Sequence, residues 1–158
     1  MRWLLAMPLT AALATSAAAQ SGILRAGGAE FLGVKTYWTE KRDGCRPAIS
    51  FQVKNTSADE IGPIEFRLEV VDTDSHSVFA RGEASLASSD LPPRRSREIA
   101  IGGDRDITPL DCLGDMHQIA FSGIHFTVRL NATIGKDAEH GKIAWDTPMS
   151  EERVPAQN

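Results

Sequence analysis

The stretch AISFQVKNTSADEIGPIEFRLEVVD, residues Ala48–Asp72, decides the fold class. Apolar and polar residues alternate over Ile49–Val53 and again over Ile64–Val70, which is the period of two of a half-buried β-strand. Between them, Asn55–Glu60 is a polar run whose Asn, Ser and Asp residues favour turns, and a Gly-Pro pair marks the start of the second segment. The stretch therefore predicts two antiparallel strands joined by a loop.

The same alternation recurs along most of the chain. We expect further strands at Phe31–Trp38, Val78–Ala80, Glu83–Ala87, Glu98–Ile101, Gln118–Ser122, Ile124–Asn131 and Lys142–Trp145. The side chains expected to share the core are Ile49, Phe51, Val53, Phe66, Leu68, Val70, Phe126 and Val128. Short strands separated by turns predict an all-β fold, an antiparallel immunoglobulin-like β-sandwich of about seven to nine strands, with an open barrel as the alternative.

The first 19 residues have the layout of a secretory signal peptide. Arg2 gives a positive start, Trp3–Ala14 is an apolar run, and the small residues Ala17 and Ala19 precede an expected cleavage site after Ala19. The apolar run has about 12 residues, fewer than the roughly 20 that a spanning helix needs. No later stretch is long enough to span a bilayer. We therefore expect a periplasmic or secreted protein with no transmembrane segment in the mature chain.

After cleavage about 139 residues remain, which is the size of one domain. We expect a single β-sandwich over residues 20–146 and a mobile, polar C-terminal tail over residues 147–158, which carries two prolines. The whole chain has 17 basic and 21 acidic residues, and loss of Arg2 makes the balance slightly more acidic. This balance argues against a nucleic-acid partner, which favours a basic domain.

The chain has two cysteines, Cys45 and Cys112. In an exported protein an isolated pair predicts one structural disulfide. It would close a loop of about 68 residues and stabilise the fold by roughly 4 kcal/mol in the chain-entropy treatment. The alternative is a redox or metal-binding thiol pair, but such pairs are usually close in sequence.

The run FQVKNTS…PIEFRLEVVD…LPPRRSREIAI resembles the strand, Asn turn, strand, Leu-Pro, strand layout of bacterial immunoglobulin-like envelope domains, including the FxLYD type. The resemblance covers about 55 residues, roughly Ala48 to Ile101, and depends mostly on strand periodicity and turn residues. The Gly that typically follows Leu-Pro is Pro93 here, and no literal FxLYD string occurs. The resemblance implies a sandwich with a binding or scaffolding role and carries over no catalytic residue.

The chain contains candidate ligands for a metal ion. Met116, His117 and Met149 offer the soft thioether and imidazole ligands that suit copper, and they define the alternative function of an exported metal carrier. No cofactor is expected under the leading hypothesis. The acidic segment Asp72–His76 lacks the Gly and Glu of a calcium loop and is interpreted as a surface turn. Asn55 and Asn131 each begin a glycosylation sequon, whose use depends on the host.

Arg94, Arg95 and Arg97 form a basic cluster after a Pro-Pro pair. The cluster offers bidentate contacts to an anionic partner, or it forms a solvated loop whose charges discourage edge pairing. The sequence has no readable acid–base pair, nucleophile context or phosphate loop, so we do not expect an enzyme. The leading hypothesis is a non-enzymatic exported β-sandwich that binds another envelope or secreted protein as an accessory subunit, chaperone or inhibitor.

Overall fold

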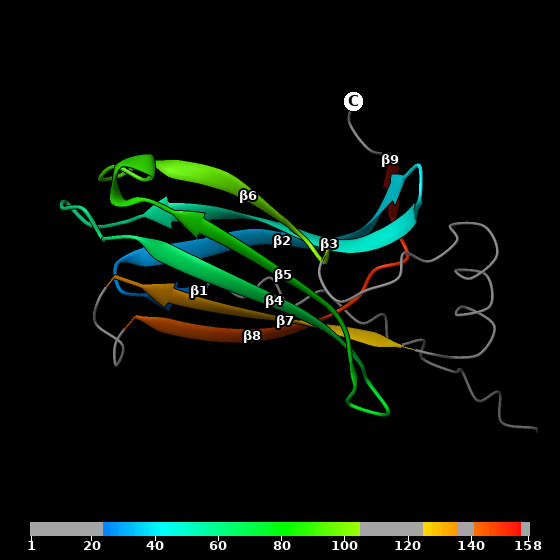
Figure 1. Cartoon of the computed structure of the whole chain (residues 1–158). Coiled ribbons are helices and arrows are strands. Elements are labelled where there is room, and N and C mark those ends of the chain that lie inside the picture. Colours follow the sequence, from blue (N-terminus) through cyan, green and yellow to red (C-terminus); the bar gives the residue numbers. More distant parts are fainter. Residues whose placement is uncertain (1–23, 105–124, 136–140, 156–158) are drawn as a thin grey trace, which may run out of the picture.

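A computed structural model describes residues 24–104, 125–135 and 141–155. They form two stacked sheets (Figure 1). Sheet A has the order β1-β2-β3-β6, and β9 pairs with β2 on the same side as β1. Its strands are β1 (Leu24–Ala26), β2 (Ala29–Lys41), β3 (Gly44–Asn55), β6 (Ser96–Gly102) and β9 (Arg153–Pro155). Sheet B has the order β5-β4-β7-β8. Its strands are β4 (Ile64–Asp72), β5 (Val78–Leu86), β7 (Phe126–Ile134) and β8 (Lys142–Pro148).

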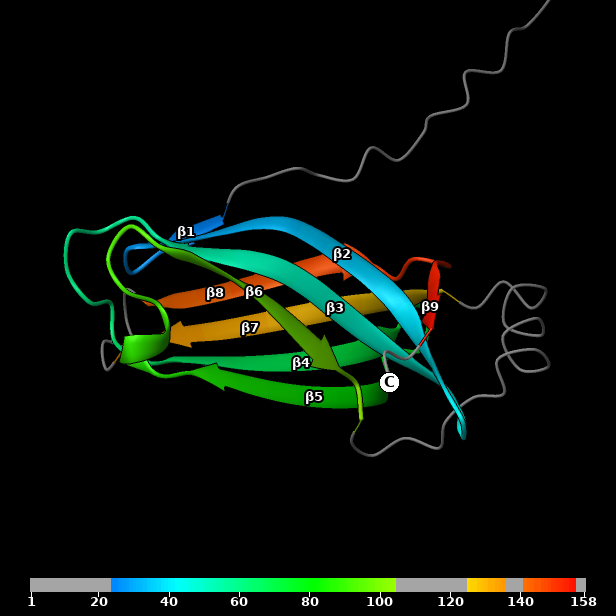
Figure 2. The same cartoon turned by 90° about the horizontal axis from the view of Figure 1, so that it is seen from above.

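Strand pairing is antiparallel throughout, except that β9 runs parallel to β2. Seen from above, β2, β3 and β6 cross the strands of sheet B obliquely (Figure 2). The expected all-β sandwich is therefore confirmed, with nine strands among the described residues. In the same residues no helix is long and apolar enough to cross a membrane.

The core lies between the two sheets and follows the alternation of the sequence. On β4 the buried residues Ile64, Phe66, Leu68 and Val70 alternate with side chains that point away from the core. Aromatic rings fill the centre, with Phe51 and Phe66 in edge-to-face contact at a centroid distance of 5.3 Å. Seven of the eight expected core residues are buried. Phe126, the eighth, is only partly buried because it packs at the end of the sandwich, where the second apolar cluster begins.

The strand predictions at residues 31–38, 78–80 and 83–87 need correction. The two short strands expected at residues 78–80 and 83–87 are one strand, β5. The strand expected at residues 31–38 is longer at both ends, and β1 precedes it as a hairpin partner that sequence analysis missed. The expected strand at residues 118–122 lies outside the described residues, as does Ile124, where another strand was expected to begin.

Strand β5 contains Gly82 in its interior, where a glycine usually weakens a strand. A Cβ atom at this position would lie 2.1 Å from the carbonyl oxygen of Gly102 on β6. The backbones of β5 and β6 therefore approach each other here more closely than any side chain allows. This contact closes one side of the sandwich between the two sheets.

The C-terminal segment differs from the expected free tail. The hydroxyl of Thr36 on β2 donates to the carbonyl of Pro148 at 3.0 Å and accepts from the amide of Ser150 at 2.8 Å. Beyond this crossover, β9 pairs with Trp38–Glu40 of β2. Residues 147–155 are thus hydrogen-bonded into the fold, because they satisfy backbone groups at the edge of β2 that would otherwise face solvent. Residues 156–158 lie outside the described part.

Candidate functional site

The arginine loop, residues Leu91–Arg97, is a fixed structure at one end of the sandwich. The amide of Arg95 donates to the carbonyl of Pro92 at 3.1 Å, which closes a four-residue turn. Arg94 occupies the third position of this turn with a positive φ of 61°, a conformation that normally favours Gly or Asn. Leu91 is buried and anchors the loop in the core. The turn is therefore held on both sides before any partner binds.

The three arginines predicted as a cluster have different surroundings. The guanidinium of Arg94 donates to the carbonyl of Thr56 in the neighbouring loop. Arg97 forms an exposed ion pair with Asp90, with Nη1 and Oδ1 3.2 Å apart. The side chain of Arg95 is exposed and has no ion pair with any described residue. Only Arg95 therefore presents its charge without a described protein partner.

Asn55 organises this end of the molecule, a role that sequence analysis missed. Its side chain is fully buried, and its Nδ2 donates to the carbonyls of Asp59 at 3.0 Å and Leu91 at 3.3 Å. Its Oδ1 accepts from the amide and the hydroxyl of Ser57, both at 2.9 Å. The backbone amide of Asn55 also donates to the carbonyl of Arg95 at 2.8 Å. Asn55 thus connects the β3–β4 loop to the arginine loop.

The two sequons differ in accessibility. The amide nitrogen of Asn55 is used in two hydrogen bonds within a buried site, so the folded protein offers it to no modifying enzyme. Asn131 is exposed on the outer face of β7. An Asn-x-Ser/Thr pattern in the sequence cannot separate these cases, because both asparagines occur at positions where a strand or a turn is plausible.

Strand β6 begins within the arginine loop, at Ser96, and is an edge of sheet A. Among the described residues it pairs only with β3, from Ser96 opposite Lys54 to Gly102 opposite Ala48. Ile99 and Ile101 are buried, whereas the other residues from Ser96 to Ala100 are exposed. The outer edge of β6 approaches β5 at Gly102, and the two strands diverge toward the start of β6 (Figure 2).

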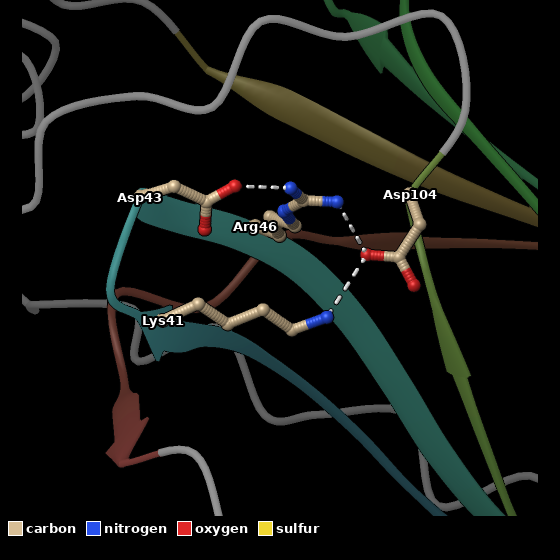
Figure 3. A network of polar contacts seen from close by, with 4 residues as sticks. All are labelled: Lys41, Asp43, Arg46 and Asp104. Carbon is tan, nitrogen blue, oxygen red and sulfur yellow. Dashed lines mark hydrogen bonds and ion pairs between the residues drawn. The ribbon is translucent and has the colours of Figure 1, made fainter.

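At the opposite end, the β2–β3 hairpin carries the polar network drawn in Figure 3. Arg46 donates from Nη2 to Asp43 at 2.6 Å and from Nη1 to Asp104 at 3.2 Å, and Lys41 lies 3.4 Å from the same Asp104 oxygen. The hydrogen bond from Arg46 lowers the pKa of Asp43, and the same bond raises the pKa of Arg46. The network attaches the hairpin to the chain that leaves β6, which is a structural role.

Cys45 is fully buried next to this network and packs against Trp38. Cys112 lies outside the described residues, so the Cys45–Cys112 disulfide stays a prediction. Burial of Cys45 at the end of a hairpin is compatible with a structural sulfur, because it leaves the sulfur no direct exposure to solvent.

The residues proposed for copper are only partly described, because Met116 and His117 lie outside the described residues. Met149 packs against the buried cluster of Trp38 and Cys45, as Phe79 and Phe126 also do, and its amide donates to the carbonyl of Phe126 at 2.8 Å. A flexible thioether suits such an irregular gap between rings. The described contacts therefore give Met149 a packing role.

The acidic segment Asp72–His76 is a turn between β4 and β5, as interpreted from the sequence. Oδ1 of Asp72 accepts the amides of Asp74 and Ser75, both at 2.9 Å. These backbone hydrogen bonds, that from Ser75 above all, lower the pKa of Asp72. The carboxylate is engaged with its own turn, and no group of three or more His, Cys, Asp or Glu residues suited to a metal ion occurs in the described parts.

No protein-family model and no curated protein matches this chain. A protein from Arabidopsis thaliana with a known solution structure is 12% identical, with 92% of this chain covering 93% of that one at a TM-score of 0.47. A β-glucuronidase of glycoside hydrolase family 2 is also 12% identical, with 75% of this chain covering only 11% of the enzyme at a TM-score of 0.46. The CARDB domain of a Pyrococcus furiosus protein, solved in complex with di-metal ions, is 11% identical, with coverages of 85% and 100% and a TM-score of 0.36.

All three TM-scores are below 0.5, and none of these structures supports the resemblance to the FxLYD family. Because the identities and TM-scores are low, no activity, ligand or partner of these proteins is transferred to this chain.

Proposed function

We propose that this chain is an exported, non-catalytic β-sandwich that binds another envelope or secreted protein. The observation that carries the proposal is the continuity of two features, the turn that presents Arg95 and the edge strand β6 that follows it. An edge strand offers backbone N–H and C=O groups that an extended segment of a partner can pair with. The guanidinium of Arg95 suits a carboxylate on that segment.

The partner segment is therefore extended and carries at least one acidic side chain near the end that meets Arg95. The turn is already ordered by its hydrogen bonds to Pro92 and Asn55, so binding costs less conformational entropy than it would for a mobile loop. The chain as a whole is acidic, with a net charge of −4, so a local positive charge also favours one orientation of the partner over the others. Accessory subunit, chaperone and inhibitor are all roles that this mode of binding serves.

The first test places a photo-crosslinking residue at Ala100 on β6 and, as a control, at Lys35 on β2, which is also exposed. We expect a partner from the native envelope or secreted fraction to crosslink through position 100 and not through position 35. Hydrogen exchange of Ser96–Ala100 should then slow when the purified partner is added, because new backbone hydrogen bonds form. Equal crosslinking from both positions, or unchanged exchange, would contradict pairing at β6.

The second test changes Arg95 to Ser. Replacing all three arginines would be less informative, because Arg94 and Arg97 already contact Thr56 and Asp90. We expect Arg95→Ser to weaken the complex with little change in stability, and 0.5 M salt to weaken the wild-type complex similarly.

Mass spectrometry of the mature protein tests export. We expect an N-terminus at Gln20, and an intact Met1 on exported protein would be the contrary result.

A further inference from the structure

The outer face of sheet B is hollowed and lies on the other sheet from the β6 edge. The strand registers arrange its outward side chains in three rows that cross β5, β4, β7 and β8 in that order. The rows are Arg81–Glu69–Arg129–Asp146, Glu83–Arg67–Asn131–Ala144 and Ser85–Glu65–Thr133–Lys142. A hollow of about 740 Å³ covers most of the second and third rows and the β5–β4 part of the first.

The first row neutralises its own charges. Nε of Arg81 lies 3.4 Å from Oε1 of Glu69, and Nε of Arg129 lies 3.5 Å from Oδ2 of Asp146. Each acid is matched by a base on the adjacent strand, which is the arrangement expected of a solvated sheet face.

The other two rows are different. Glu65, Arg67 and Lys142 are exposed, line the hollow, and have no ion pair or side-chain hydrogen bond with any described residue. Glu65 and Arg67 stand two residues apart on β4, which places their Cα atoms about 7 Å apart. Lys142 is two strands away from Glu65, at about 10 Å. The hollow thus holds Glu65 and Arg67 along one strand, with a second acid, Glu83, opposite Arg67 on β5 and a second base, Lys142, two strands away.

The residues that line the hollow also indicate which kind of ligand suits it. None of its side chains is aromatic, so it offers no surface on which a sugar ring or a base would stack. Its floor consists of backbone and the small side chain of Ala144, and Asn131 and Thr133 supply neutral hydrogen-bonding groups. These features favour a polar, extended ligand with charges of both signs.

We propose that this hollow binds an extended peptide segment that carries an acidic and a basic residue two positions apart. In an extended peptide the side chains at positions i and i+2 point the same way and lie about 7 Å apart, which matches the spacing of Glu65 and Arg67. The acidic side chain pairs with the guanidinium of Arg67, the basic one pairs with Glu65, and Asn131 hydrogen-bonds to the peptide backbone. Lys142 selects segments with a further acidic residue. This site is separate from the β6 edge and does not depend on it.

The test uses amide NMR of the isotope-labelled mature chain and two synthetic peptides, acetyl-Thr-Glu-Thr-Lys-Thr-amide and its uncharged counterpart with Gln in place of Glu and Lys. We expect the charged peptide to shift the amides of β4, β7 and β8, Asn131 and Thr133 among them. Arg67→Gln should weaken this binding at least fivefold, and Glu65→Gln should weaken it as well. Lys35→Gln, an exposed change on sheet A, is the matched control and should bind as the wild type does.

The amide spectra of the variants also show that each is folded, which is expected because all three positions are exposed. Three outcomes would overturn the proposal. They are equal shifts with the uncharged peptide, wild-type affinity in Arg67→Gln, or shifts confined to amides outside sheet B. A result of the last kind at β6 would instead support the edge-strand function.

Discussion

Replacing Asn55 with Ala should destabilise the protein by about 3 kcal/mol, because the side chain is buried and satisfies four hydrogen bonds. The largest loss is at the carbonyl of Leu91, whose hydrogen bond with Asn55 is buried. Leaving such a group unsatisfied costs roughly 1–3 kcal/mol. The three contacts with Asp59 and Ser57 are less buried, so water replaces them in part and each adds about 0.5 kcal/mol.

Urea unfolding of the mature protein measures this difference. We expect a lower midpoint with an unchanged slope, since the change affects stability and not the surface exposed on unfolding. Asn131→Ala is the matched control, because Asn131 is exposed and its loss should change stability by less than about 0.5 kcal/mol. Asn55→Asp sharpens the test. A carboxylate at this position would face two carbonyl oxygens, so this variant should be less stable at pH 7 than at pH 4, where its protonated form can donate one hydrogen bond.

A loss below about 1 kcal/mol in Asn55→Ala would refute the reasoning, because it would mean that the two loops keep their arrangement without the amide. If the loss is as large as expected, the same variant should also weaken partner binding at the arginine loop, since Asn55 connects that loop to β3.

Three further predictions concern the fold. Gly82→Ala should destabilise the protein by about 2–4 kcal/mol, since a Cβ would lie 2.1 Å from the carbonyl oxygen of Gly102, whereas the exposed Ser85→Ala on the same strand should be nearly neutral in urea unfolding; similar midpoints would refute the close approach of β5 and β6. Thiol titration of the unfolded, unreduced mature protein should find no reactive thiol if Cys45 and Cys112 are joined, and two reactive thiols would exclude the bond. The pKa of Asp72 is lowered in the folded state, so the ionised carboxylate contributes to stability above its unfolded pKa, and this contribution is lost as the pH falls through the folded pKa. The stability difference between wild type and Asp72→Asn should therefore shrink on acidification. A difference that grows would contradict the role of the Ser75 and Asp74 amides.

Local periodicity was sufficient to determine the fold class and most of the core. A half-buried strand must alternate apolar and polar side chains, and the segments around Phe51, Phe66 and Val128 do so without interruption, so their inward faces were read correctly from the chain alone. The turn at Asp72 was also legible, because its hydrogen bonds join residues that are two or three positions apart.

Contacts between segments far apart in the sequence were decided only by the tertiary structure. Asn55 looks like an ordinary turn residue until Leu91 is placed against it, and Gly82 looks like a break in a strand until Gly102 is seen beside it. Met149 belongs to an apolar cluster because Thr36 holds its segment at the edge of β2, which no local pattern indicates. Strand register likewise brings the charges of Glu65, Arg67 and Lys142 to one part of the outer face of sheet B. Alternation depends on each strand by itself, whereas the pairing between strands depends on the whole sheet, so the sequence pattern does not reveal this grouping.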